Sequence, residues 1–111
     1  VEAPYSIELV REDIMYGTVA NIRVKAGHGD NLLAVMEKWE NERGHEVKGN
    51  LGGYIVRLDK DPQEMILVAV FEDKDSYKAN ADDPEQDKWY QEIRQYLEAD
   101  PEWNDGEFFP M

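Results

Sequence analysis

Apolar and polar residues alternate along residues 16–25, and this alternation predicts a β-strand. One face of the strand would carry Thr18, Ala20, Ile22 and Val24, and the other would carry Val19, Asn21, Arg23 and Lys25. Because the first face contains no charged residue, we expect it to pack against the core.

Residues 27–44 show the different spacing of an amphipathic helix. Gly27 and Gly29 permit a tight turn, and Asp30 is placed to cap the first turn of the helix. The core-facing stripe is formed by Leu32, Leu33, Met36 and Trp39. Gly44 follows as the expected left-handed stop.

Two further strands are predicted at residues 51–59 and 65–71, joined by turn-forming residues at 59–62. The second of these strands is apolar on both faces. A strand buried on both sides needs a layer on each side of the sheet, and the chain has too few other apolar elements to provide two layers. We therefore expect a second copy of the chain to cover one face, with either Leu67 or Ala69 pointing toward it.

Two helices follow, one at residues 73–81 and one that begins at Pro84. Tyr77 is the main apolar side chain of the first helix, and Asp83 would cap the second. The apolar stripe of the second helix is formed by Trp89, Ile93, Tyr96 and Leu97. We expect a short final strand at residues 107–111.

The resulting order of elements, β-α-β-β-α-α-β, is that of an α+β protein with a ferredoxin-like split β-α-β unit. A length of 111 residues allows one domain, which we place at residues 16–111. Residues 1–15 have few apolar anchors, so we expect them to form an N-terminal extension that adds at most an edge strand.

The chain is strongly acidic, with 25 acidic against 12 basic residues and a net charge of −13. Such a charge repels phosphate backbones and anionic headgroups, so we expect neither nucleic acid nor a membrane surface as a partner. The longest apolar run, at residues 65–71, is far shorter than the ~20 residues of a membrane-spanning helix. The chain has no cysteine and no export signal at its start, so we expect a cytoplasmic location.

Few residues of the sequence could carry familiar catalytic chemistry. Ser6 and Ser76 are the only serines, and neither lies in a Gly-x-Ser-x-Gly elbow. His28 and His45 lack the spacing of metal ligands, and the sequence has no phosphate-binding glycine motif. We therefore predict that the protein uses no metal, nucleotide or other cofactor.

Several segments together resemble the antibiotic biosynthesis monooxygenase family of dimeric α+β barrels. They are the strand NIRVKAG with the helix start GHGDNLLAVMEKW, the segment GGYIVRLDKDPQEMILVAVFEDKDSYKAN, and the helix DKWYQEIRQYL. The resemblance covers residues 16–111. It implies a homodimer formed sheet to sheet, and an apolar pocket between the sheet and the helices of each subunit.

The haem-degrading branch of this family uses an Asn on the first strand, a Trp in the short helix and a His in the last helix. Ala20 occupies the Asn position here, and Asn21 is one residue away, on the opposite face of the strand. The Trp position falls near Asn80 and the His position near Tyr90. Because a phenol replaces the usual iron ligand, a haem-dependent activity is disfavoured.

The quinone-forming branch, which oxidises phenolic polycycles with molecular oxygen and without metal or flavin, fits the chain better. The resemblance implies pocket roles for Asn21, Tyr54, Tyr77 and Trp89, and catalytic roles for His45 and Tyr90. His45 is the natural base, because its unperturbed pKa lies near the working pH. Each of these residues also has a purely structural interpretation, as a core aromatic, a polar group at the dimer contact or a solvated loop residue.

Two functions stay open at this point. The first is a cofactor-independent monooxygenase that acts on a small aromatic or polyketide-like compound. The second is a non-catalytic dimeric module that binds a small hydrophobic ligand or serves in a stress response. An enclosed cavity with convergent polar groups would favour catalysis, whereas a pocket filled by Trp89 and Tyr54 would favour the second function.

Overall fold

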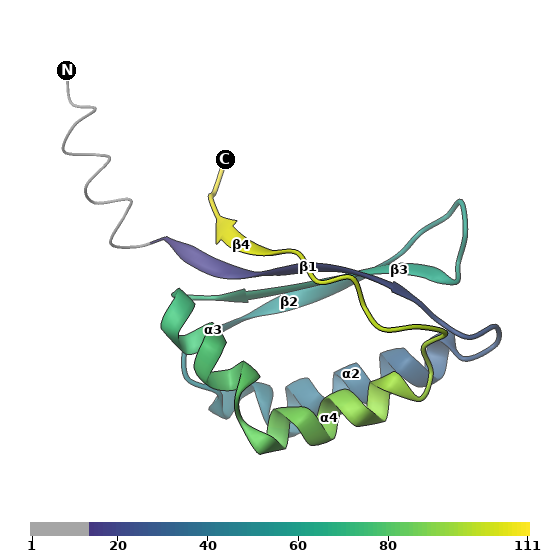
Figure 1. The fold of residues 1–111 in the computed structure, drawn as a ribbon, viewed down its shortest axis with the longest axis horizontal. Helices are drawn as coiled ribbons and strands as arrows, with labels where there is room; N and C mark the ends of the chain where they lie inside the picture. The colour runs from purple at the N-terminus through teal and green to yellow at the C-terminus, as the bar shows by residue number, and fades with distance from the viewer. Residues whose placement is uncertain (1–13) are drawn as a thin grey trace.

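The computed structural model describes residues 14–111, which form one sheet with its helices on one face (Figure 1). The elements follow in the order β1 (Met15–Arg23), α2 (Gly29–Glu42), the 3₁₀ turn η1 (Gly44–Glu46), β2 (Asn50–Arg57), β3 (Glu64–Phe71), α3 (Lys74–Ala81), α4 (Pro84–Arg94) and β4 (Asp105–Phe108). No helix in this part of the chain combines the length and the apolar character needed to cross a membrane.

The four strands pair in the order β2-β3-β1-β4, and every neighbouring pair is antiparallel. Helices α2, α3 and α4 all lie below the sheet in Figure 1, and within the described residues the opposite face carries no second layer. The protein is therefore an α+β protein with a ferredoxin-like arrangement, as the sequence predicted.

The inward and outward faces of β1 follow the predicted alternation. Thr18, Ala20, Ile22 and Val24 are all buried beneath the sheet. On β3, Leu67 pairs with Ala20 and Ala69 pairs with Thr18, so both face the helices. The expectation that one of them points toward a partner subunit was therefore wrong, because residues two apart share a face and the outward positions of β3 are Ile66, Val68 and Val70.

The predicted start of α2 was also wrong. The helix begins at Gly29 with His28 in the cap position, and no side chain caps it. Asp30 lies in the first turn, where its carboxylate accepts a hydrogen bond from Arg57 Nη2 at 2.9 Å. Asp30 therefore bonds to a side chain of β2, which is distant in the sequence, and not to the backbone N–H groups at the start of its own helix.

The end of α2 differs from the expectation as well. Gly44 does not adopt a positive φ and instead opens η1. It is buried, and a Cβ added to it would collide with the side chain of Glu40 and come close to the ring of Trp39. Backbone handedness therefore does not account for a glycine at this position, and the atoms nearest to the added Cβ belong to the flexible end of Glu40.

The second half of the chain follows the prediction more closely. Asp73 caps α3 and Asp83 caps α4, with Pro84 at the first helical position. Helix α4 ends at Arg94, so Leu97 lies beyond it and forms an isolated bridge with Val24. The last strand is shorter and earlier than expected, at Asp105–Phe108.

The edge strand considered within residues 1–15 falls mostly on residues 1–13, which lie outside the described part of the chain. Met15 belongs to β1, where it pairs with Phe108 of β4. The division into an extension and a domain at residue 16 stays a prediction.

The core is concentrated under one half of the sheet. Its buried members are Ile22, Val24, Leu32, Met65, Ile93 and Leu97. They come from β1, α2, β3 and α4, with Val24 just after β1 and Leu97 just after α4. This cluster therefore joins the sheet to both long helices. Most of the hydrophobic stabilisation of the described domain therefore lies at this end.

Replacement of Leu32 by Ala is expected to lower the free energy of unfolding by about 2–5 kcal/mol, because the side chain is fully enclosed and its loss leaves a cavity. Urea denaturation followed by circular dichroism measures the change. The matched control is Lys38→Ala on the exposed face of the same helix, which is expected to cost less than about 0.5 kcal/mol. Equal effects of the two substitutions would contradict this account of the core.

Candidate functional site

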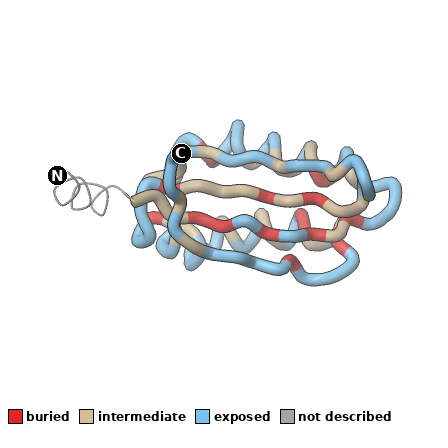
Figure 2. Tube along the Cα trace, turned by 90° about the horizontal axis from the view of Figure 1, so that it is seen from above, coloured by how far each residue is buried: buried red, intermediate tan, exposed pale blue. Residues whose placement is uncertain are grey.

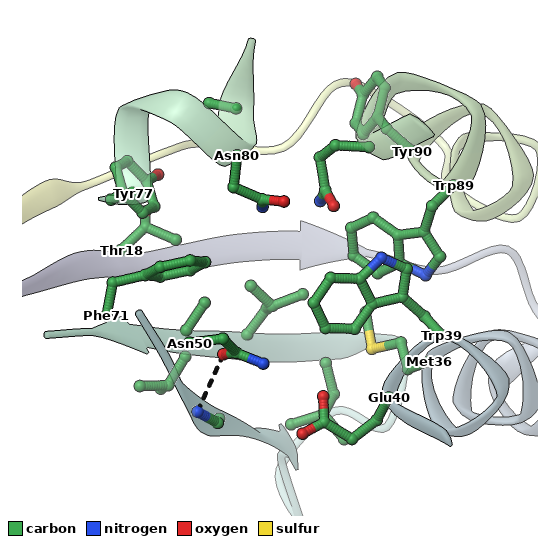
Figure 3. Close-up of a pocket in the computed structure, with 18 of the residues that line it drawn as sticks. Thr18, Met36, Trp39, Glu40, Asn50, Phe71, Tyr77, Asn80, Trp89 and Tyr90 are labelled. Carbon is green, nitrogen blue, oxygen red and sulfur yellow. Dashed lines mark hydrogen bonds between the residues drawn. The ribbon is translucent and has the colours of Figure 1, made fainter. Parts of the chain in front are cut away.

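A cavity of about 970 Å³ lies between the sheet and the three helices, at the end opposite to the main core cluster. Figure 3 shows its walls, with α3 and α4 on one side, α2 on the other and the sheet behind. The volume is at the upper end of the range of about 300–1,000 Å³ that is typical of small-molecule pockets. The cavity is partly open to solvent.

One row of small residues across the sheet creates this space. Gly53, Ala69, Thr18 and Asp105 lie side by side on β2, β3, β1 and β4, and all four line the cavity. Further along the same face, a second row has long side chains that reach the helices. It is formed by Arg57, Met65 and Ile22. The cavity therefore lies where the inward side chains are short, and the core lies where they are long.

Large apolar and aromatic side chains form the rest of the walls. Met36 and Trp39 come from α2, Phe71 from β3, and Trp89 and Tyr90 from α4 (Figure 3). The rings of Trp39 and Trp89 have centroids 5.4 Å apart, with an angle of 45° between their planes. Helices α2 and α4 are thus held together by this aromatic pair, which closes one end of the cavity.

Several polar atoms in the walls are buried without a hydrogen-bond partner in the described structure. They are Thr18 Oγ1, Trp39 Nε1, Trp89 Nε1 and Gln86 Oε1. Thr18 lies close to the Tyr77 hydroxyl, whose proton is donated to Asp105. Because buried polar groups are nearly always paired, their concentration around one cavity is typical of a binding or catalytic site.

Tyr77 has a fixed hydrogen bond at the edge of the cavity. Its hydroxyl donates to Asp105 Oδ1 at 2.8 Å, and its ring contacts Tyr16 and Phe71 edge to face. Burial raises the pKa of Tyr77 well above the ordinary value for a phenol, and the hydrogen bond to the Asp105 carboxylate raises it further. Tyr77 therefore stays protonated at neutral pH and acts as a donor, not as a base.

Asn80 is held so that its amide group faces the cavity (Figure 3). Arg43 Nη2 donates to Asn80 Oδ1 at 3.3 Å, and the same nitrogen donates to Asp83 Oδ2 at 3.0 Å. This arrangement orients the amide, and Asn80 Nδ2 has no partner among the described residues. Asn80 can therefore offer an N–H donor to a ligand.

Tyr90 lines the same side of the cavity as Asn80 (Figure 3). Its ring centroid lies 6.2 Å from that of Trp103, which also lines the cavity. Burial raises the pKa of Tyr90, and the negative charge of Asp100 adds to this shift. Like Tyr77, Tyr90 keeps its proton at neutral pH.

The structure brings three of the six site residues expected from the sequence to the cavity with their side chains. These three are Tyr77, Trp89 and Tyr90. Tyr54 belongs to the lining, but it pairs with Val68 on the outer face of the sheet and is 78% exposed. Tyr54 and Trp89 therefore do not fill the described cavity together, because the Tyr54 side chain lies on the other face of the sheet.

The other two residues lie elsewhere. Asn21 is on the outer face of β1, where Nδ2 donates to Glu102 Oε1 at 3.3 Å. His45 lies in η1 with 66% of its side chain exposed, and Nε2 is 3.9 Å from Glu46 Oε1. Neither residue lines the cavity.

Sequence reasoning gave no ligand role to Thr18, Trp39, Asn80 or Gln86. Thr18 and Trp39 fitted the periodic apolar stripes of a strand and a helix, so they were interpreted as core residues. Asn80 was singled out only as the residue at the family's Trp position. This positional match was the one available signal for it.

Among residues 14–111, no group of three or more His, Asp or Glu side chains is close enough together to hold a metal ion. The cavity wall supplies amide, indole and hydroxyl groups instead. The absence of a cofactor stays a prediction.

The fold and the cavity define an α+β protein with a ligand-sized site between its sheet and its helices. Residues 15–92 match the family model for antibiotic biosynthesis monooxygenases, so the chain belongs to this family. Membership supports a general monooxygenase-like function. A comparison with curated proteins found no match.

Solved structures with the same fold come from several organisms. A Bordetella bronchiseptica protein, described provisionally as an antibiotic biosynthesis monooxygenase, has a TM-score of 0.76 at 17% identity over 87% of this chain and 99% of its own. A Caulobacter crescentus protein with the same provisional description has a TM-score of 0.76 at 11% identity over 93% and 99%. A conserved protein from Methanosarcina mazei has a TM-score of 0.75 at 12% identity over 88% and 96%. At these identities the likeness shows the fold alone.

Replacement of Tyr77 by Phe tests the bond to Asp105. At neutral pH the loss is expected to be about 1 kcal/mol of unfolding free energy, the usual net contribution of one hydrogen bond. Because the pKa of Tyr77 is raised in the folded state, its contribution is present below the ordinary value of 10.0 and is lost as the pH rises further. Denaturant unfolding at neutral and alkaline pH should therefore show the difference between the two proteins shrinking above pH 10.0. A constant difference, or one matched by Tyr54→Phe on the exposed face, would contradict this assignment.

Proposed function

We propose that the protein is a cofactor-independent monooxygenase that oxidises a small phenolic aromatic or polyketide-like compound in this cavity. The observation that carries the proposal is the combination of an apolar, aromatic space with the oriented amide of Asn80 and the buried, unpaired polar atoms around it. Such a space removes a flat aromatic substrate from water while leaving donors for its oxygen.

In the proposed reaction, a phenol and one molecule of oxygen give a quinone and water. The phenol loses its hydroxyl proton and one ring hydrogen, one oxygen atom becomes a new ring carbonyl, and the other oxygen atom leaves in water. The electrons that reduce the oxygen molecule all come from the phenol. No external reductant is needed, so an electron-rich substrate in a dry site is sufficient.

The residues of the cavity have separate roles in this proposal. Trp39 and Trp89 supply flat apolar surfaces against which a ring can pack. Asn80 Nδ2 donates to the substrate oxygen as negative charge develops on it. The proposal leaves out the catalytic role expected for His45, because this side chain is directed to solvent near Glu46.

A specific observation also favours the second candidate, a dimeric module that binds a small hydrophobic ligand without catalysis. Neither His28 nor His45 belongs to the cavity lining, and the raised pKa of Tyr77 keeps its proton in place. The lining therefore lacks an imidazole base for a phenol, and a substrate that does not ionise readily would only bind.

Oxygen uptake with a panel of polyphenols tests the proposed reaction. The wild type is expected to consume oxygen and to incorporate one labelled atom from ¹⁸O₂ into the product. Asn80→Ala should reduce kcat by about 100-fold, because one donor to a developing oxyanion is typically responsible for a factor of this size. His45→Ala is the matched control and should retain full turnover, since its side chain lies away from the cavity.

The absence of oxygen uptake on every substrate that binds would instead favour the non-catalytic module. Unchanged turnover in the Asn80 variant would remove the amide from the mechanism. A large loss in the His45 variant, with the fold intact, would restore the role that the sequence suggested.

We also propose that the protein is a homodimer in which the outer faces of two sheets meet. Figure 2 shows the sheet from above as a backbone trace. On its outer face Tyr54 and Val56 of β2 are exposed, and Val68 of β3 lies between Tyr54 and Val19 of β1. Val56, close to the end of β2, is 44% exposed. A second copy would remove this apolar surface from water, and family membership supports the same arrangement.

The dimer proposal predicts a dimeric mass by sedimentation equilibrium at micromolar concentration. Val68→Asp should shift the protein to monomers, because each dimer would bury two unpaired carboxylates near its centre. The control Ala34→Asp, on the exposed side of α2, should stay dimeric. A monomeric wild type would refute the proposal.

A further inference from the structure

The charged side chains that line the cavity are almost all acidic. They are Glu37 and Glu40 on α2, Asp82 after α3, Asp87 on α4, Asp105 on β4, and one cation, Lys78 on α3. All of them are exposed, and only Asp105 belongs to the sheet that forms the floor, so the others surround the mouth of the cavity. Figure 3 shows Glu40 on the side of the cavity opposite to Asn80 and Tyr90. Asp87 lines the cavity from α4, the helix that also carries Tyr90.

Most of these carboxylates are not neutralised by neighbours. Within the described residues, none of Glu37, Glu40, Asp82 and Asp87 takes part in an ion pair. Asp105 accepts a hydrogen bond from the neutral Tyr77 hydroxyl and has no cationic partner among the described ion pairs. The nearby guanidinium of Arg43 is balanced by Asp83. The mouth therefore has a clear negative excess.

The floor beneath this mouth is built to contact a ligand. Thr18 is 2% exposed, and its hydroxyl oxygen has no hydrogen-bond partner in the described structure. Leu67 and Phe71 beside it are buried and apolar. An apolar floor favours an aromatic ring, and the carboxylates at the mouth favour a positive charge. The cavity therefore fits a molecule with an aromatic body and a cationic end.

We propose that the cavity selects aromatic compounds that carry a protonated amine, and that it discriminates against carboxylates and phosphates. The inference rests on the proposed function in taking the same cavity as the substrate site, and it names the substrate class. Carboxylates around a cavity with low-dielectric walls attract a cation more strongly than the same charges spread over a flat surface. The amine would lie at the mouth, between the α2 carboxylates and Asp87, with the ring system on the apolar floor.

The net charge of −13 would also attract cations to the whole molecule. The test must therefore separate the effect of the carboxylates at the mouth from the effect of the total charge. The mouth variant is Glu37→Gln, Glu40→Gln and Asp87→Asn in one protein. Its matched control is Glu42→Gln, Glu92→Gln and Glu107→Gln, which removes the same charge from exposed positions that do not line the cavity.

Isothermal titration calorimetry with 2-naphthylmethylamine, 2-naphthol and 2-naphthoate measures the preference without any turnover. At about 20 mM salt, the wild type and the control variant are expected to bind the amine at least about tenfold more tightly than the naphthoate. The ratio should fall below about threefold at about 500 mM salt, where the carboxylates are screened. The mouth variant should show the same small ratio at low salt.

Equal or tighter binding of naphthoate by the wild type would overturn the inference. An equal amine preference in the mouth variant and the control variant would also overturn it. Failure of the wild type to bind any of the three probes would have the same consequence. Because binding is measured without oxygen consumption, a protein that prefers the amine but consumes no oxygen would refute the proposed reaction and leave the charge selection standing.

Discussion

The cross-strand row of Gly53, Ala69, Thr18 and Asp105 is the constraint on which the site depends. Four antiparallel strands place these positions side by side beneath the helices, and their short side chains leave the space that longer ones fill elsewhere on the same face. Gly53 cannot be enlarged, because an added Cβ would collide with the carbonyl oxygen of Val68. The cavity is therefore a consequence of backbone pairing, and the helices only close it.

Much of the fold could be predicted from periodicity, because burial selects side chains at intervals of two in strands and of three to four in helices. The face of β1 that carries Thr18, and the cap of α4 at Asp83, followed directly from these patterns. The start of α2 did not, because Asp30 found a tertiary partner in Arg57 that no local pattern reveals. Gly44 was misinterpreted as well, since it has no positive φ and opens η1, where it is buried beside Trp39 and Glu40.

The site was less accessible to sequence reasoning than the fold. Tyr77, Trp89 and Tyr90 reach the cavity because they are large residues on the inner sides of α3 and α4. His45 was attractive for its chemistry, but the position of a side chain after a helix depends on the path of the next turn, which the sequence did not specify. The arrangement of Asn80 depends on Arg43, which is 37 positions away in the chain. Such pairs become visible only once the elements are packed.

The central claim is that small aromatic compounds bind on the helix side of the sheet, in the cavity between Trp39 and the floor around Thr18. Each tryptophan gives one indole N–H signal in a ¹H–¹⁵N correlation spectrum, so titration with 2-naphthol reports on the site directly. The account predicts large shifts for the Trp39 and Trp89 indole signals and unchanged backbone signals for Val56 and Ile66, which pair on the outer face and do not line the cavity. Shifts confined to the outer face, with both indole signals unchanged at saturation, would contradict it.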